Sequence, residues 1–373
     1  MRNQGIELIY PGHIRTLKIQ NFKSIKSLEL EPKRVNLFIG KPNTGKSNVL
    51  EALSLLETRP IKNYIRFRDI FDIFWETDPT NKISITTELT SVSLFYERGV
   101  IFERIDQVDE YNKLRDTDRL NFKYKTRTGL DNVYDLQSPI NYDLGGHETE
   151  EKVALIYPPG AKTNESHNHP KLRTPIIGSS LKYYKFKEGI DFSRHENTIQ
   201  LLSPFGDNLS MVYNYNKDVQ KVVNELLYAE NFSLIYRAQN RTLEVISKPD
   251  SKYLLPLNSL ADTFLRQVFF LTAIHSNKQK VLAFEEPEAH TYPPFIKQLA
   301  LEIAGAHENQ FFIATHSPYL AENLWENLDE NELQVYVVSN KGEGTEVNPI
   351  PSAELGKLIR NRTDLFFNLS RFS

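Results

Sequence analysis

The sequence contains no cysteine among its 373 residues. This absence excludes disulfide bonds, thiolate nucleophiles and zinc sites that depend on cysteine. The sequence also has no apolar stretch near the roughly 20 residues that a membrane-spanning helix needs, and its amino terminus lacks the apolar segment of a signal peptide. We therefore expect a cytoplasmic protein with no membrane contact.

The sequence also lacks a large excess of either positive or negative charge. The 45 Lys and Arg residues nearly balance the 48 Asp and Glu residues, which gives a formal net charge of −3. Such a balance provides no overall attraction to nucleic acid, so DNA binding would require a local basic patch or an oligomeric surface. With 40% hydrophobic residues, the chain can form one large domain or two moderate ones.

The most informative segment is the one that fits the pattern G-x-x-x-x-G-K-[ST]. It follows an apolar run, Val35 to Ile39, and precedes a helix-like run, Asn48 to Leu56. A strand, a glycine-containing loop and a helix in this order predict a phosphate-binding P-loop. The nucleotide-binding residues predicted here are Gly40, Lys41, Pro42, Asn43, Thr44, Gly45, Lys46, Ser47 and Asn48.

The spacing of this loop matches the chemistry of a triphosphate. The glycines allow the backbone to bend so that successive N–H groups converge at the positive end of the following helix. Lys46 would neutralise charge on the β- and γ-phosphates, and Ser47 would offer its hydroxyl to Mg²⁺. We therefore predict ATP and Mg²⁺ as cofactors.

Two carboxylates follow a second apolar run, Val281 to Phe284. Because ligands of a parallel sheet bind at the carboxyl ends of its strands, we expect Glu285 and Glu286 at the same edge as Lys46. Glu285 would orient Mg²⁺ or its waters, and Glu286 would accept a proton from the water that attacks the γ-phosphate. The alternative is a solvated acidic turn after a strand.

A histidine follows a third apolar run. The helical spacing of Phe295 to Ala304 leads into Phe311 to Ala314, and His316 comes just after this predicted strand. There it could hydrogen-bond the γ-phosphate, although a lone histidine is often only structural. His167 and His169 lie in a polar segment, and we interpret them as loop residues rather than metal ligands.

Together these residues resemble a known family. The segment Ile14 to Ile25, the P-loop and Asn48 to Leu53 resemble the start of ABC-type ATPase heads of the RecF, structural-maintenance-of-chromosomes (SMC) and OLD (overcoming lysogenisation defect) group. The segment Glu285 to His290 resembles that group's Walker B motif with its EPE extension, and Ala314 to Pro318 resembles its switch histidine. Leu201 to Leu209 is similar to a less specific stretch of the same group.

The resemblance implies an α/β P-loop NTPase fold with an ABC-ATPase-like head. It also implies an ATP hydrolase that works as a homodimer or a higher even oligomer, with Lys46, Glu286 and His316 as catalytic residues and Ser47 and Glu285 at the metal. The family usually has Asp in place of Glu285. Its Leu-Ser-x-Gly signature is degenerate in the segment Asn258 to Arg266, which leaves dimer-dependent hydrolysis open.

The middle of the chain is expected to form an insert. We assign 1–60 and 250–373 to the nucleotide-binding core, and 61–249 to a β-rich lobe and a helical subdomain. No heptad array is present, but strand-like runs occur at Lys82 to Leu89 and Val92 to Tyr96, and an amphipathic helix is expected around 219–227.

Basic and aromatic residues interleave at Arg119 to Arg127 and at Lys182 to Lys187. These segments could hold a DNA backbone, but we favour the interpretation of two strands with solvated lysine faces.

The carboxyl-terminal part after His316 is too short for the TOPRIM nuclease that follows OLD-type heads. It predicts a strand pair, Glu332 to Val338 with Glu346 to Ile350, and a helix that begins at Ser352. An effector, a nuclease or a toxin, would then be a separate protein, as in two-gene bacterial anti-phage systems.

We therefore expect an ABC-type ATPase that binds and hydrolyses Mg-ATP in order to switch a partner effector or a DNA-bound state, in anti-phage defence. Two alternatives stay open: a RecF-like DNA-repair ATPase, and an ATP-bound scaffold or sensor that does not hydrolyse.

Overall fold

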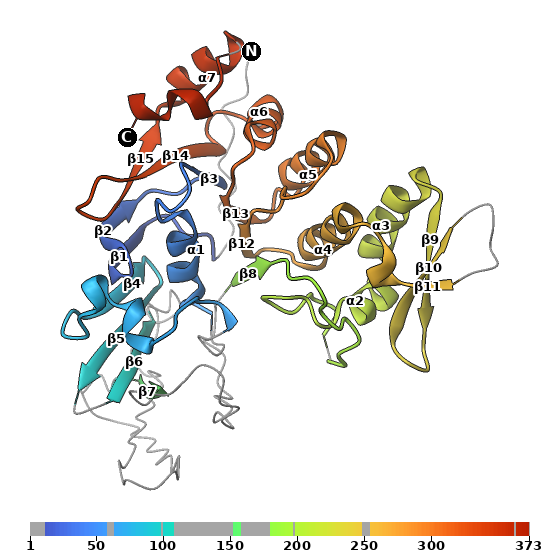
Figure 1. Cartoon of the computed structure of the whole chain (residues 1–373), viewed down its shortest axis with the longest axis horizontal. Helices are drawn as coiled ribbons and strands as arrows, with labels where there is room; N and C mark the ends of the chain where they lie inside the picture. Colours follow the sequence, from blue (N-terminus) through green and yellow to red (C-terminus); the bar gives the residue numbers. More distant parts are fainter. Residues whose placement is uncertain are drawn as a thin grey trace, which may run out of the picture.

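The computed structural model describes residues 12–57, 63–97, 100–107, 152–157, 180–196, 198–247, 254–361 and 363–372. A central, mostly parallel sheet lies between two other parts of the molecule (Figure 1). An antiparallel sheet and helix α1 lie on one side of it, and helices α4, α5 and α6 lie on the other. A small sheet packs beyond α4. The α/β P-loop fold expected from the sequence is confirmed.

The central sheet has the strand order β15-β14-β3-β13-β12-β8. All neighbours are parallel except β14 and β15. Every residue of β3, β12 and β13 is buried, because both faces of a parallel sheet are covered. The strands are β3 (Val35–Ile39), β8 (Leu181–Lys185), β12 (Val281–Glu285), β13 (Gln310–Ala314), β14 (Leu333–Asn340) and β15 (Thr345–Ile350).

Alternate residues of the central strands contact different layers, as the two-residue period of a strand requires. Leu37 packs among residues of the helices α4 (Asp262–Ser276), α5 (Pro293–Gly305) and α6 (Pro318–Asn327). Phe38 packs in the other core, with α1 (Lys46–Ser54). The P-loop helix is therefore held between the central sheet and the antiparallel sheet.

The antiparallel sheet, here called the antiparallel lobe, has the strand order β2-β1-β4-β5-β6-β7. Its strands β4 and β5 confirm the two strands that the sequence predicted in this region. The strands are β1 (Leu17–Phe22), β2 (Ile25–Leu30), β4 (Ile83–Thr87), β5 (Thr90–Glu97), β6 (Val100–Gln107) and β7 (Lys152–Tyr157). Two short 3₁₀ turns, Ile70–Ile73 and Trp75–Thr77, precede β4.

The helical subdomain contains α2 (Leu209–Tyr215), α3 (Lys217–Ala229) and a small sheet with the order β11-β10-β9. The predicted amphipathic helix is confirmed, since its apolar face in α3 is buried. The strands are β9 (Phe232–Arg237), β10 (Thr242–Ser247) and β11 (Leu254–Pro256), and a 3₁₀ turn at Leu257–Ser259 leads to α4.

The carboxyl-terminal part also confirms its prediction. Strands β14 and β15 pair antiparallel, α7 (Ser352–Arg360) begins where the sequence placed it, and a 3₁₀ helix occupies Phe366–Arg371. None of the helices in the described ranges is both long enough and apolar enough to cross a membrane.

One prediction requires correction. The segment Lys182 to Lys187 forms a strand, β8, only as far as Lys185, and the two lysines of that strand are partly buried in ion pairs: Lys182 pairs with Glu57 at 2.9 Å and is 20% exposed, and Lys185 pairs with Glu285 and is 31% exposed. The sheets also exchange strands across the proposed boundary at residue 60, since β1 and β2 belong to the antiparallel lobe whereas β8 belongs to the central sheet. The boundaries 1–60, 61–249 and 250–373 thus stay a prediction. Arg119 to Arg127, His167 and His169 lie outside the described residues.

Candidate functional site

The P-loop connects β3 to α1, and its two glycines are required by close packing. A Cβ atom at Gly40 would lie 2.3 Å from the carbonyl oxygen of Val338. At Gly45, φ is +102° and a Cβ atom would lie 2.1 Å from Oγ1 of Thr345. Because the β14–β15 hairpin leaves no room for side chains here, the loop follows a path that only glycine allows.

Lys46 is the first residue of α1, and its side chain lies over the loop. Its Nζ donates to the carbonyl oxygens of Gly40, at 3.0 Å, and Lys41, at 2.8 Å. Burial lowers the pKa of Lys46 to about 8, and the Glu286 carboxylate acts in the opposite direction. The ammonium group keeps a third N–H for a phosphate oxygen.

The start of α1 is suited to an anion. Its N-cap is Gly45, which provides no side-chain hydrogen bond to the first turn. The N–H groups of that turn therefore have no cap of their own, and a phosphate group would satisfy them. Ser47, in the same turn, is partly exposed.

The central sheet brings the other predicted residues to the same edge. Strand β13 lies between β3 and β12, so the segments after these three strands are neighbours. The Glu286 N–H donates to the carbonyl oxygen of Ala314 at 2.9 Å, which places the turn after β12 against the end of β13. The alignment of strands that the sequence predicted is therefore confirmed.

Glu286 and His316 face each other at this edge. Glu286 Oε1 lies 3.5 Å from His316 Nε2, and the two side chains are 46% and 39% exposed. Burial lowers the pKa of His316, the Lys46 ammonium lowers it further, and Glu286 opposes both. Lys46 is near enough to Glu286 and His316 for their charges to affect one another's pKa, and Glu286 and His316 lie in contact.

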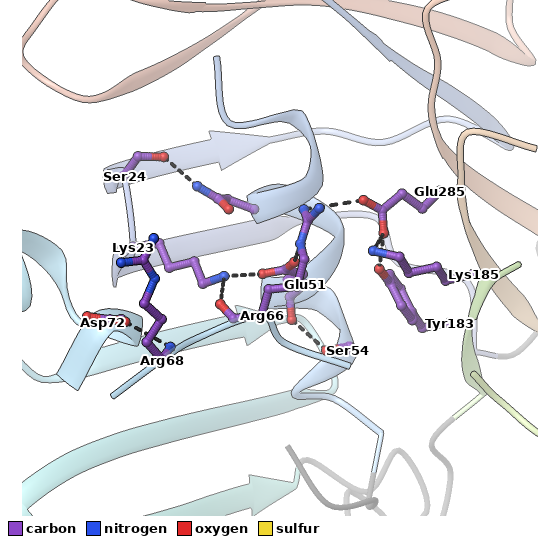
Figure 2. Close-up of polar contacts among 11 residues, drawn as sticks. Lys23, Ser24, Glu51, Ser54, Arg66, Arg68, Asp72, Tyr183, Lys185 and Glu285 are labelled. Carbon is purple, nitrogen blue, oxygen red and sulfur yellow. Dashed lines mark hydrogen bonds and ion pairs between the residues drawn. The ribbon is translucent and has the colours of Figure 1, made fainter. Parts of the chain in front are cut away.

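Glu285 occupies a different environment, which Figure 2 shows. Its side chain is buried, and the Tyr183 hydroxyl donates to its Oε2 at 2.6 Å. Lys185 Nζ lies 2.9 Å from the same oxygen, and an Arg66 nitrogen lies 3.3 Å from Oε1. Burial alone would raise the pKa of Glu285, but Lys185 and Arg66 bring it below its ordinary value. Glu285 is therefore an ionised carboxylate with both oxygens engaged.

The same contacts continue to the P-loop helix. Arg66 Nε donates to Oε1 of Glu51 at 2.7 Å, and Lys23 pairs with Oε2 of Glu51. Glu51 lies on α1 and is fully buried. Figure 2 shows these side chains as one row, Lys23–Glu51–Arg66–Glu285–Lys185, which we call the ionic row. It connects the antiparallel lobe, α1 and the ends of β12 and β8.

A second set of contacts joins the lobe to the loop. Ser24, in the turn between β1 and β2, lies 2.6 Å from Thr345 Oγ1 and accepts from Asn48 Nδ2 at 2.7 Å. Thr345 Oγ1 also donates to the carbonyl oxygen of Thr44 at 3.0 Å. Asn48, predicted to bind nucleotide, therefore uses its side chain to hold Ser24 beside the loop.

Mg²⁺ fits Ser47 better than it fits Glu285. Magnesium keeps several waters and takes further ligands from phosphates, so it needs few protein oxygens. The described residues include no cluster of three or more His, Asp or Glu side chains that could hold a metal. Tyr183, Lys185 and Arg66 already contact the two oxygens of Glu285, so a metal or its waters near Glu285 would share the carboxylate with these groups.

The degenerate signature segment leads into α4, which begins at Asp262. Asp262 pairs with Arg266 at 2.7 Å and lies 3.2 Å from Nδ1 of His290, in the segment after β12. Ser259, just before this helix, is exposed. The start of α4 is therefore connected to the segment that follows β12 and begins with Glu286.

Neutralising Glu51 tests the ionic row. We expect Glu51→Gln to lower the free energy of unfolding, because Lys23 and Arg66 would lose the charge that compensates them. Removing one partner of a fully buried pair costs roughly 3 to 5 kcal/mol, and since Arg66 is 57% exposed we expect about 2 kcal/mol. Urea denaturation measures this loss. Glu29→Gln, in the exposed pair with Lys18, is the matched control and should leave stability nearly unchanged.

Residues 35–322 match the family described as "AAA domain, putative AbiEii toxin, Type IV TA system". The match extends from β3 into α6 and includes the P-loop, both glutamates and His316. The chain belongs to this family. This match confirms that the chain is an ABC-like P-loop ATPase of the AAA-domain type, as the sequence motifs indicated.

No curated protein matches this AAA-domain protein in sequence at a significant level. Among solved structures, it is similar to an SMC head bound to the C-winged helix domain of ScpA, with 13% identity, 92% of this chain and 99% of that chain covered, and a TM-score of 0.48. An SMC head domain from Thermotoga maritima has 12% identity, coverage of 90% and 98%, and a TM-score of 0.41.

A third similar structure is an SMC head domain with an extended coiled coil, bound to the C-terminal domain of ScpA derived from Pyrococcus furiosus. It has 14% identity, coverage of 94% and 99%, and a TM-score of 0.46. At these identities and scores, the likeness carries no inference about activity or partners.

Proposed function

We propose that this protein is an ABC-type ATPase that binds Mg-ATP at the P-loop and hydrolyses it. The observation that carries the proposal is the convergence of Lys46, Glu286 and His316 at one edge of the central sheet, beside the uncapped start of α1. A strand-end carboxylate near a P-loop has the position that a base for water requires.

Each residue has a defined role in the proposal. Lys46 and the N–H groups of the P-loop hold the triphosphate, and Ser47 provides a hydroxyl for Mg²⁺. When bound, the metal neutralises charge on the phosphates. Glu286 accepts the proton of the attacking water. His316, neutral because burial and Lys46 lower its pKa, donates to or accepts from the γ-phosphate region.

We further propose that the protein assembles as a homodimer or a higher even oligomer and switches a separate effector. The family description, which includes a toxin of a toxin–antitoxin system, supports a role in anti-phage defence. A DNA-bound state stays a weaker candidate, because the aromatic residues of Lys182 to Lys187 are buried in the central sheet and Lys185 pairs with Glu285.

Two observations favour a second candidate, an ATP-bound scaffold that does not hydrolyse. Glu285 is held in ion pairs, and the signature segment lacks the serine and glycine of the family at Ala261 and Thr263. Both features would slow turnover while leaving ATP binding intact.

The assembly proposal predicts that ATP joins the subunits. A nucleotide that binds only the closed assembly stabilises it in proportion to the ligand excess. Light scattering of Glu286→Gln should therefore show a larger mass with ATP and Mg²⁺ than with ADP. Ser259→Arg, placed before α4, should reduce this difference. Asn240→Arg adds the same charge at an exposed turn of the small sheet and should not change it.

If the mass is the same with ATP, ADP and no nucleotide, ATP-driven assembly is wrong and the constitutive scaffold is favoured. If Asn240→Arg weakens association as much as Ser259→Arg does, the assembly surface does not lie at the start of α4.

A further inference from the structure

Glu288 is a buried acid for which the proposed mechanism has no role. It lies in the turn after β12, two residues beyond Glu286, and is only 7% exposed. Its Oε1 accepts two hydrogen bonds, from the Thr315 hydroxyl at 2.7 Å and from the His316 backbone N–H at 2.9 Å. Its Oε2 has no hydrogen-bond partner within the described ranges of the chain.

These bonds join two turns that carry different site residues. Thr315 is fully buried, its N–H donates to the carbonyl oxygen of Phe38 at 3.1 Å, and its hydroxyl accepts from the Ser317 N–H at 3.0 Å. The Thr315 hydroxyl is therefore the centre of the turn after β13. Glu288 is the group from the turn after β12 that holds it.

The His316 backbone is fixed by Glu288, whereas the His316 ring faces Glu286 at 3.5 Å. Glu286 is itself in a left-handed conformation, with φ at +45°. A strained residue persists only where its surroundings hold it in place. The separation between the Glu286 carboxylate and the His316 ring thus depends on how the two turns are joined.

We propose that Glu288 is a positioning residue that holds His316 at its working distance from Glu286. The inference rests on the proposed ATPase function. Glu288 is the third residue of the segment Glu286-Pro287-Glu288, and it would act on the reaction only through His316.

Substitutions of Glu288 can show whether its hydrogen bonds or its charge are needed. Burial raises the pKa of Glu288, while its bonds to Thr315 and His316 oppose the shift. A neutral carboxyl would serve as well as a carboxylate, because a single oxygen accepts both bonds. Glutamine reproduces that oxygen and the shape of the side chain, so Glu288→Gln should keep the arrangement, whereas Glu288→Ala removes both bonds.

The experiment measures ATP turnover, ATP affinity and amide hydrogen exchange in the full chain. For Glu288→Ala we expect turnover to fall by about 10- to 100-fold, the range seen when groups that orient an active residue are removed. ATP affinity should stay within about 3-fold of wild type, because Glu288 does not belong to the P-loop. The His316 amide should exchange about 10-fold faster or more, because it loses its acceptor.

Three variants control for mere loss of structure. Glu288→Gln should restore turnover to within about 3-fold of wild type, as a conservative replacement that keeps the acceptor. Thr315→Val removes one of the two donors to Glu288, together with the acceptor of the Ser317 N–H, and its turnover should lie between those of Glu288→Gln and Glu288→Ala. Glu302→Ala breaks an acid–histidine contact away from the site, 2.7 Å from the ring of His275 and between α5 and α4, and should leave turnover unchanged.

The outcomes are distinct. Wild-type turnover in Glu288→Ala, or equal loss in the Gln and Ala variants, overturns the proposal. If Glu288→Ala does not fold, Glu288→Gln and Thr315→Val are compared instead. Wild-type turnover in Glu288→Gln together with lowered turnover in Thr315→Val supports the positioning role, and any other result contradicts it. If the wild type itself releases no phosphate, the ATPase proposal fails, and amide exchange at His316 alone then decides whether Glu288 holds this turn.

Discussion

ATP binding is expected to be lost in Lys46→Ala. The Lys46 ammonium lies over the P-loop, and its loss would leave triphosphate charge uncompensated in a partly buried loop. Calorimetry with ATP and Mg²⁺ measures the affinity directly. We expect no measurable binding in this variant and ordinary binding in the wild type.

Lys41→Ala is the matched control. Lys41 is exposed, and its contribution to the described loop contacts is a backbone carbonyl that alanine retains. Lys41 is one of the predicted nucleotide-binding residues, but alanine keeps the backbone groups of this position, so the ATP affinity of Lys41→Ala should stay close to that of the wild type. Unchanged affinity in Lys46→Ala would mean that the nucleotide site has been assigned to the wrong loop.

Turnover is expected to fall by about 100-fold or more in Glu286→Gln, the size typical of the loss of a general base. Glutamine keeps the shape of the side chain and its hydrogen bonding but cannot accept the proton. ATP should therefore bind and stay intact. A phosphate-release assay combined with chromatography of the bound nucleotide measures both properties.

Glu285→Gln distinguishes the two acids. A large loss in Glu285→Gln with none in Glu286→Gln would show that their roles are exchanged. Because the amide removes the counter-charge of Lys185 and leaves Arg66 paired with Glu51 alone, Glu285→Gln should also lose stability, whereas replacement of the exposed Glu286 should not. A thermal melt of each variant therefore accompanies the kinetics.

Three strands of the central sheet, β3, β12 and β13, could be predicted from the sequence because they are short and mostly apolar. Runs such as Val281 to Phe284 have both faces covered, and polar residues mark their ends. Glycine and lysine spacing located the P-loop, and the rule that strand ends share an edge located Glu286 and His316. These predictions needed only local patterns and one topological rule.

The ionic row could not be predicted in the same way. Its members come from five separate segments, and no periodicity connects Lys23, Arg66 and Lys185. The one local signal was Glu51, an acid among the apolar residues of α1, which had to find a cation when buried. Burial of Glu51 requires a cationic partner, but no local pattern in the sequence identifies which one.

Strand β8 was misjudged for a related reason. Its alternation of lysine with aromatic residues is typical of a half-exposed strand, and the sequence favoured solvated lysines. In the fold, β8 is the edge strand beside β12, where Lys182 and Lys185 meet the buried acids Glu57 and Glu285. Long side chains can carry their charge to such partners while their stems stay packed.

The ionic row also relates the antiparallel lobe to the site. Lys23 contacts α1 from the lobe, and Ser24 contacts the P-loop through Thr345 and Asn48. Lys23 and Ser24, which hold the antiparallel lobe, thus lie close to the loop where the proposed nucleotide would bind. This arrangement is consistent with a protein that transmits the state of its nucleotide to a partner.

The most direct test of the central claim is phosphate release by the purified wild-type chain with ATP and Mg²⁺, measured beside Glu286→Gln under the same conditions. We predict steady release by the wild type, lost on removal of Mg²⁺, and about 100-fold slower or more in Glu286→Gln. Equal release by the two proteins, or none by a wild type that binds ATP, would contradict hydrolysis at this site.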